Sequence, residues 1–253
     1  MAVHVFIIPG NPGIVGYYDD LAKRLKDNNV KVDVLRYNSF SDSLSEKLFS
    51  IEDEFADKRE QILKLINPRD RNILVGHSIG GWISLRLMQE IDFESCILVF
   101  PFLKKDFSYK QLGINIALRY REPVVRLYDN IRKNWLGNVL LTKVVNSIDM
   151  SYAANKVTRE WFLDGNAARK CLNLAKTEFD TLKYTFDFDI MEKVKDRLVF
   201  YYCNDDMWAP INDYNIISNL GCKTKLINCS HDFCVKKDEV KIITAEILKD
   251  INE

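Results

Sequence analysis

A short motif centred on a serine carries the clearest chemical signal in this sequence. Residues 76–80 read Gly-His-Ser-Ile-Gly, directly after the apolar run 73–75 and directly before a helical pattern. This spacing is typical of the sharp strand-to-helix turn that presents a nucleophilic hydroxyl. Side chains in place of Gly76 and Gly80 would crowd such a turn. We therefore expect Ser78 to be a nucleophile for acyl transfer, and the alternative is a tight turn with an inert serine.

A serine nucleophile needs a general base within hydrogen-bonding reach. The chain has three histidines. His77 adjoins the serine, so its side chain should point away from the hydroxyl. His4 stands at the start of the first apolar run, far from the edge of the sheet where sites form. His231 follows the last short apolar run, and we expect it to be the base.

The third member of such a site is a carboxylate that orients the imidazole and stabilises its cation. The apolar run 198–202 leads into two adjacent candidates, Asp205 and Asp206. We prefer Asp206 because it stands four residues before Pro210, the usual spacing of this acid loop, and Asp205 remains the alternative. The chain order Ser, Asp, His is that of α/β-hydrolases and differs from the order in chymotrypsin and subtilisin.

Acyl transfer also needs two backbone N–H groups that hold the developing oxyanion. Ile79, the residue after the nucleophile, should supply one, at the N-terminus of the following helix. The second should come from residues 9–13, which read Pro-Gly-Asn-Pro-Gly after the first apolar run. We expect the Asn11 N–H to be this donor, since the flanking prolines have no N–H and stiffen the loop. An ordinary turn at a strand end is the alternative.

Short apolar runs alternate with helical patterns, which indicates an α/β fold with a mostly parallel sheet flanked by helices. The expected strands cover residues 3–8, 31–36, 72–75, 96–100, 197–203 and 223–229. The expected helices outside the central region cover residues 17–27, 52–66, 81–90 and 237–251. The proposed site residues follow strands of this sheet, so its carboxyl edge should bring them together.

Residues 102–192 interrupt this alternation with helical patterns and no convincing strand. We interpret the chain as a single domain over residues 1–253 in which 102–192 form a helical cap over the catalytic edge. One wide apolar face in the cap comprises Trp135, Leu136, Val139, Leu140, Leu141, Val144, Val145 and Ile148. The simplest expectation is that this face packs on the core. The alternative is contact with a phospholipid monolayer, with Lys133 and Lys143 near the head groups.

Composition limits the partners and the compartment. The chain has 253 residues and 36 Lys and Arg against 36 Asp and Glu, so its formal net charge is zero. This balance argues against a nucleic-acid partner. The start lacks a basic leader, and no stretch approaches the ~18 apolar residues of a transmembrane segment. We therefore expect a cytoplasmic protein whose six cysteines are mostly reduced and buried.

A metal site is the main competing use of the proposed base. Cys229, His231 and Cys234, with Cys222 as a fourth ligand, could in principle bind zinc, but their spacing is not a common zinc pattern. Since His231 serves better as a base, we expect no metal and no cofactor. The serine at position 78 also disfavours hydrolases that use an aspartate nucleophile.

Several motifs together resemble the lipid-droplet-associated hydrolase family. They are residues 8–13 with Tyr17-Tyr18, residues 75–80, Phe100-Pro101, Tyr201-Tyr202 with Asp206-x-Trp208-x-Pro210, and His231-x-Phe233. The resemblance implies an α/β-hydrolase fold with a helical insertion, a triad of Ser78, Asp206 and His231, and association with neutral-lipid droplets. One departure is that the family's Ser-Pro-Asn-Gly stretch has no clear counterpart in residues 108–113.

These observations predict a serine hydrolase of the esterase or lipase type that cleaves a lipid-derived acyl ester at or near lipid droplets. An acyl thioesterase would use the same residues. The rival hypothesis from another class is a non-catalytic lipid-binding or droplet-surface protein that retains a hydrolase scaffold. The complete pattern of serine, acid and base argues against that rival, because an inert scaffold has no physical need for it.

Overall fold

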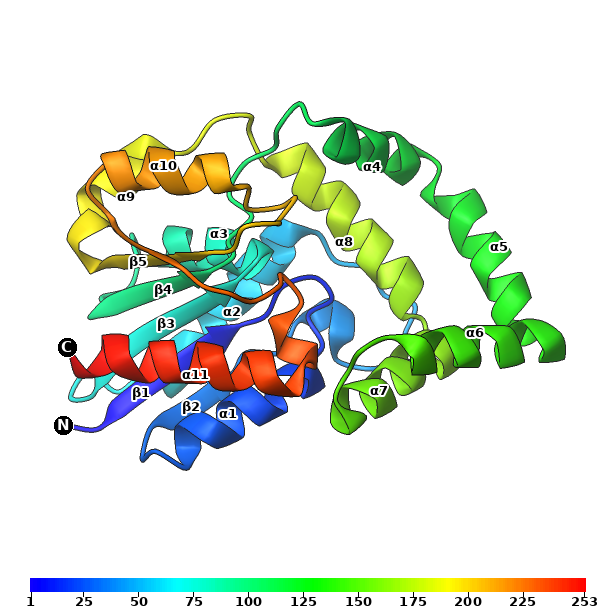
Figure 1. Ribbon diagram of the computed structural model, residues 1–253, viewed down its shortest axis with the longest axis horizontal. Coiled ribbons are helices and arrows are strands. Elements are labelled where there is room, and N and C mark those ends of the chain that lie inside the picture. Colours follow the sequence, from blue (N-terminus) through cyan, green and yellow to red (C-terminus); the bar gives the residue numbers. More distant parts are fainter.

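A six-stranded sheet forms the centre of the computed structural model, which describes residues 1–253 (Figure 1). The strands are β1 (Val3–Ile8), β2 (Lys31–Val34), β3 (Arg71–His77), β4 (Ser95–Val99), β5 (Leu198–Tyr202) and β6 (Lys223–Leu226). Their spatial order is β2-β1-β3-β4-β5-β6, and every neighbouring pair is parallel. The predicted fold class and all six predicted strands are confirmed, with strand ends that shift by no more than three residues.

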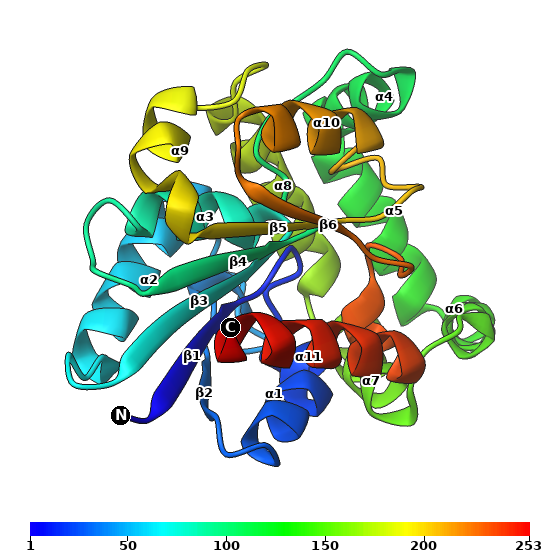
Figure 2. The ribbon, with the colours of Figure 1, turned by 60° about the vertical axis from the view of Figure 1, so that its left-hand side comes forward.

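Helices cover both faces of this sheet. The helix α1 (Asp19–Lys26) packs with α11 (Lys237–Asn252) on one face, while α2 (Ile51–Leu65) and α3 (Ile79–Leu87) lie on the other (Figure 2). The inner strands β1, β3, β4 and β5 are buried almost throughout, as a parallel sheet with two covered faces requires. The carboxyl ends of these strands are therefore held rigidly, and the loops that follow them start from fixed points.

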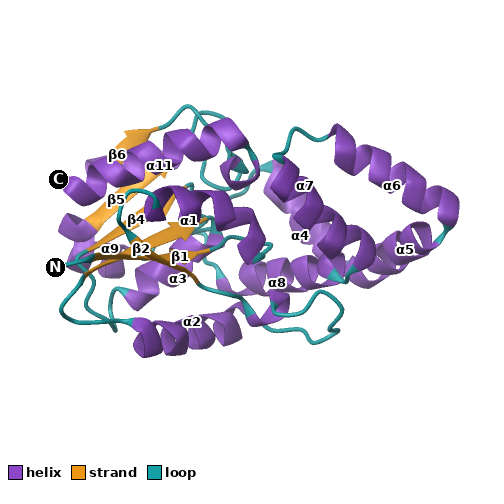
Figure 3. Cartoon of the chain, turned by 90° about the horizontal axis from the view of Figure 1, so that it is seen from below, coloured by secondary structure: helices purple, strands orange, loops and turns teal.

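The chain between β4 and β5 contains no strand. Its helices are α4 (Tyr109–Arg119), α5 (Arg121–Lys133), α6 (Trp135–Ser147), α7 (Tyr152–Thr158), α8 (Ala167–Thr181) and α9 (Phe188–Val194). The helix α10 (Ile211–Asn219) follows β5. Figure 3 shows α4 to α7 extending beyond the carboxyl ends of the strands, while α8 leads back toward the sheet. We refer to residues 102–192 as the cap segment.

The apolar face of α6 does not pack on the core, so the simplest expectation from the sequence is wrong here. Trp135, Leu136 and Leu140 are 76%, 61% and 62% exposed, and Val145 is the buried residue of the helix. The helix contacts α5, α7 and the short π-helical segment Arg159–Asp164, and these neighbours cover only part of its surface. Helical spacing of apolar residues identifies the helix but does not show whether another layer covers it.

Candidate active site

A strained turn at the end of β3 presents the serine. Ser78 has φ 53° and ψ −124°, a conformation that L-residues rarely adopt and that often marks functional turns. A Cβ atom added to Gly76 would lie 2.7 Å from the Gly80 carbonyl oxygen, and one added to Gly80 would lie 2.9 Å from the Ile8 carbonyl carbon. Both glycines are thus sterically required, for the reason that the motif suggests.

The structure brings Ser78, His231 and Asp206 together at the carboxyl edge of the sheet. The Ser78 hydroxyl lies 3.0 Å from Nε2 of His231, and Nδ1 of His231 lies 2.7 Å from Oδ2 of Asp206. With a neutral imidazole, Nδ1–H donates to the carboxylate and Nε2 accepts from the serine hydroxyl. A histidine held in this way is able to take the proton of the serine.

The two candidate acids stand next to each other in the loop after β5 but lie in different environments. Asp205 is exposed, whereas Asp206 is buried and its Oδ1 accepts hydrogen bonds from the N–H groups of Trp208 (2.8 Å) and Ala209 (3.2 Å). Burial alone would raise the pKa of Asp206, but the hydrogen bonds from His231 and from these N–H groups lower it below its usual value. The carboxyl group is therefore ionised beside the histidine.

Two backbone N–H groups near Ser78 have no partner within the protein. Ile79 is the first residue of α3, so its N–H lacks an intrahelical acceptor. In the loop after β1, the Gly10 N–H donates to the Tyr18 hydroxyl at 2.9 Å, whereas no hydrogen bond engages the Asn11 N–H. The Asn11 side chain is fixed instead, since its Nδ2 donates to the Cys171 carbonyl of α8 at 3.0 Å. The N–H groups of Asn11 and Ile79 are therefore free of hydrogen bonds within the protein.

His77 lies closer to the site than its place in the motif suggests. Its Nε2 is 2.9 Å from the carbonyl oxygen of His231, and its Nδ1 is 2.6 Å from the hydroxyl of Tyr18. Burial and then the neighbouring His231 lower the pKa of His77 to about 3, so its ring is neutral. The sequence predicted only that the His77 side chain points away from Ser78. The position of His77 next to that serine is the one feature of the sequence that places it near the site. His4 instead bonds to Asp33 at 2.7 Å.

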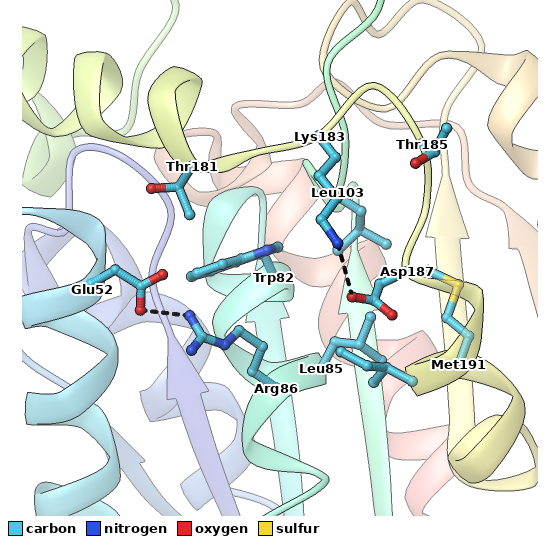
Figure 4. Close-up of a pocket in the computed structure, with 11 residues that line it drawn as sticks. Glu52, Trp82, Leu85, Arg86, Leu103, Thr181, Lys183, Thr185, Asp187 and Met191 are labelled. Atoms are coloured by element: carbon cyan, nitrogen blue, oxygen red, sulfur yellow. Dashed lines mark hydrogen bonds and ion pairs between the residues drawn. The ribbon is translucent and has the colours of Figure 1, made fainter.

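Two of the cavities in the protein lie beside α3 or next to the proposed site residues. The larger, of about 210 Å³, lies beside α3 and is bordered by the Glu52–Arg86 ion pair (2.7 Å) and by Lys183 and Asp187, 3.9 Å apart (Figure 4). No residue of the proposed triad lines it. The smaller cavity, of about 120 Å³, borders His231 and the loop after β1, and it therefore adjoins the site.

Comparison with known proteins assigns the chain to a family. Residues 1–234 match the family described as lipid-droplet associated hydrolase. The chain belongs to this family. It is 24% identical over 235 residues to the lipid droplet-associated hydrolase of Dictyostelium discoideum, which covers 86% of this chain and 76% of that protein. It is 25% identical over 236 residues to the Drosophila melanogaster protein of the same name, with coverages of 83% and 76%.

Solved structures agree with this assignment at the level of the fold. An esterase from Exiguobacterium antarcticum superposes with a TM-score of 0.69 at 11% sequence identity, and the match covers 100% of this chain and 92% of that one. Identity this low shows a shared fold alone, which is the α/β-hydrolase fold. The family resemblance drawn from the motifs is confirmed, and the chain is a member of a hydrolase family.

Proposed function

We propose that this hydrolase-family protein is a serine esterase or lipase that cleaves a lipid-derived acyl ester. The observation that carries the proposal is the hydrogen-bonded series of Ser78, His231 and Asp206, with separations of 3.0 and 2.7 Å. The series stands on a strained backbone turn, and its acid is buried and ionised. Such strain has an energetic cost that folding alone does not require, and it supports a chemical role.

The first half of the proposed reaction acylates the serine. His231 takes the hydroxyl proton as Ser78 Oγ bonds to the ester carbonyl carbon, and the carbonyl π electrons move to oxygen. The N–H groups of Asn11 and Ile79 hold that oxyanion. When the oxyanion collapses, the bond to the alcohol oxygen breaks and His231 gives the proton to the leaving alcohol. Asp206 keeps the imidazole in the correct tautomer and stabilises its cation throughout.

The second half releases the acid. A water molecule gives a proton to His231 as its oxygen bonds to the acyl carbon, and the same two N–H groups hold the second oxyanion. Collapse breaks the bond to Ser78 Oγ, which recovers its proton from His231. Apart from the ester and the water molecule, the groups that act in these steps are side chains and backbone groups of this chain.

A lipid-derived substrate is supported by the relatives and by the surface of the cap segment. The curated relatives carry the name lipid droplet-associated hydrolase. The exposed apolar residues of α6 stand beside Lys133 and Lys143, an arrangement that suits a phospholipid monolayer. None of the helices is long and apolar enough to span a bilayer. We therefore propose a cytoplasmic enzyme that meets the droplet surface through its cap.

Labelling with a fluorophosphonate probe tests the proposal, because the probe phosphonylates only an activated serine. Purified wild type should label, with or without a lipid emulsion, while Ser78→Ala and His231→Ala should not. A series of esters of increasing acyl length, with matched thioesters, would then define the substrate. A folded wild type that stays unlabelled in both conditions would refute the enzyme and leave the non-catalytic droplet-surface protein as the better hypothesis.

A further inference from the structure

A continuous set of hydrogen bonds joins the two loops that flank the nucleophile. The Gly10 N–H lies 2.9 Å from the Tyr18 hydroxyl, which lies 2.6 Å from Nδ1 of His77. Nε2 of His77 lies 2.9 Å from the carbonyl oxygen of His231. Three hydrogen bonds thus connect the loop that carries Asn11 to the loop that carries the proposed base, through the last residue of β3.

Chemistry fixes the direction of every bond in this set. A carbonyl oxygen only accepts, so Nε2 of His77 carries the ring proton and donates to His231. Nδ1 of the neutral ring then accepts, and the Tyr18 hydroxyl donates to it. The Tyr18 oxygen in turn accepts from the Gly10 N–H. We call Gly10, Tyr18, His77 and the His231 carbonyl the buried relay, a name for the bonded groups rather than for proton movement.

The relay is enclosed by the protein core. Tyr18 and His77 are 2% and 6% exposed, and Gly10 is buried. The ring of Phe233 packs edge-on against His77 with centroids 5.0 Å apart. Each buried polar group of the relay therefore forms a hydrogen bond with another member. Loss of one member leaves buried polar groups without a partner, which destabilises the folded protein.

The relay holds the two loops whose positions the proposed chemistry needs. The Gly10 bond fixes the peptide immediately before the Asn11 N–H, and the His77 bond fixes the backbone of the residue whose imidazole lies 3.0 Å from Ser78. We infer that Tyr18 and His77 are positioning residues, which keep the oxyanion donor and the base aligned with the nucleophile. This inference rests on the proposed function, and neither side chain touches the reacting atoms.

The matched pair Tyr18→Phe and Tyr17→Phe tests the inference. Both tyrosines are buried neighbours, and each substitution removes one hydroxyl, but the Tyr17 hydroxyl bonds to Thr158 at 2.8 Å outside the relay. Small misplacements of reacting groups reduce rates by up to about 100-fold. For an ester that the wild type hydrolyses, Tyr18→Phe should lower kcat by about 10- to 100-fold with KM within about twofold. Tyr17→Phe should keep kcat within about twofold of the wild type.

Two further readouts separate positioning from mere loss of stability. His77→Gln places an amide N–H near the former Nε2 and should retain more activity than His77→Ala when both are compared at equal folded fraction. Hydrogen exchange of the Gly10 amide should be faster in Tyr18→Phe than in the wild type and unchanged in Tyr17→Phe. A structural role alone would make activity follow the melting temperature and would show no rescue by glutamine.

The outcomes distinguish this inference from the proposed function. An active wild type with equally active Tyr18→Phe and Tyr17→Phe variants overturns the positioning role and leaves the esterase intact. Activity that follows stability across all four variants overturns it as well. A folded wild type that neither labels nor hydrolyses any ester refutes the proposed function, and the positioning role fails with it. Selective loss of kcat in Tyr18→Phe, with rescue in His77→Gln, supports the inference.

Discussion

At the scale of single residues, two adjacent carboxylates in the loop after β5 lie in opposite environments. Asp206 is 7% exposed and reaches His231 at 2.7 Å, whereas Asp205 is exposed to solvent. An exposed carboxylate is solvated and interacts weakly with a neighbouring charge. The buried carboxylate, with four hydrogen bonds, orients and stabilises an imidazolium much more strongly.

Replacement of each carboxylate by an amide should therefore have different effects. Asp206→Asn keeps the size of the side chain but loses the charge and allows the wrong tautomer of His231, so kcat for a soluble ester should fall by about 10²- to 10⁴-fold. Asp205→Asn serves as the control and should stay within about twofold of the wild type. Steady-state kinetics check both variants. A comparable loss in the two variants would contradict the assignment of Asp206.

The residues of the site differ in how far sequence could predict them. Ser78 stands in a local motif, and His231 follows by elimination because the chain has three histidines. The spacing to Pro210 favoured Asp206 over Asp205, and the burial of Asp206, which spacing does not determine, adds independent support. The positioning role inferred for Tyr18 and His77 was not predicted, because they lie 59 positions apart and only the folded chain brings them together.

At the scale of elements, α8 carries a buried carboxyl group next to the loop after β1. Glu178 is 4% exposed, and one of its oxygens has no hydrogen-bond partner. Burial raises its pKa to about 8, and a hydrogen bond with the Asn11 side chain opposes this shift. Glu178 is therefore protonated in the folded protein at neutral pH, whereas it is ionised in the unfolded chain.

This difference predicts a pH-dependent stability. Between about pH 5 and pH 8 the folded state retains a proton that the unfolded state has lost, so the free energy of unfolding should fall as pH rises, by about 1.4 kcal/mol per unit from this group. Glu178→Gln mimics the protonated form and should remove that slope, with a gain in stability at pH 8 over the wild type. Urea unfolding at several pH values measures this slope, and Glu46→Gln, at an exposed position, serves as the control. Equal slopes in Glu178→Gln and wild type would contradict the protonated state.

The strands were predicted from the sequence, whereas the surroundings of the cap helix α6 were not, and the difference has a physical reason. The strands were found because a parallel sheet with two covered faces needs continuous apolar runs, which are local features of sequence. The helix α6 was also found, but its surroundings were not, since an apolar helical face fits a core, a partner or a lipid equally well. Residues 42–50 form no helix or strand.

At the scale of the whole molecule, apolar exposure is concentrated in the cap segment. The strongly exposed large apolar residues there include Phe107, Tyr109, Leu112, Tyr120, Leu127, Trp135, Leu136, Leu140 and Tyr152. They lie on or next to α4, α5, α6 and α7, which extend beyond the carboxyl edge (Figure 3). The side of the molecule that bears the proposed site thus also bears the surface best suited to a lipid monolayer.

The double substitution Leu136→Asp and Leu140→Asp tests this surface. The two residues lie four positions apart on one face of α6 and are 61% and 62% exposed, so charge there should leave folding largely unchanged. Burial of a leucine side chain in an apolar phase contributes about 1.5–3 kcal/mol, so the loss of two should lower the fraction that floats with phospholipid-coated triolein droplets by about tenfold or more.

The control carries the same charges on α2, a helix outside the cap segment. Leu63 and Leu65, near the end of α2, are 48% and 41% exposed, and their double replacement by Asp should leave flotation unchanged. Hydrolysis of a soluble short-chain ester should be the same in both double variants, because neither pair belongs to the proposed catalytic machinery. If the α6 variant floats as well as the α2 variant, the droplet contact lies elsewhere and the exposed cap face has another partner. If only the α6 variant is lost from the droplets while hydrolysis of the soluble ester persists, the exposed face of α6 binds the droplet. Droplet binding and ester hydrolysis then depend on different residues on the same side of the molecule.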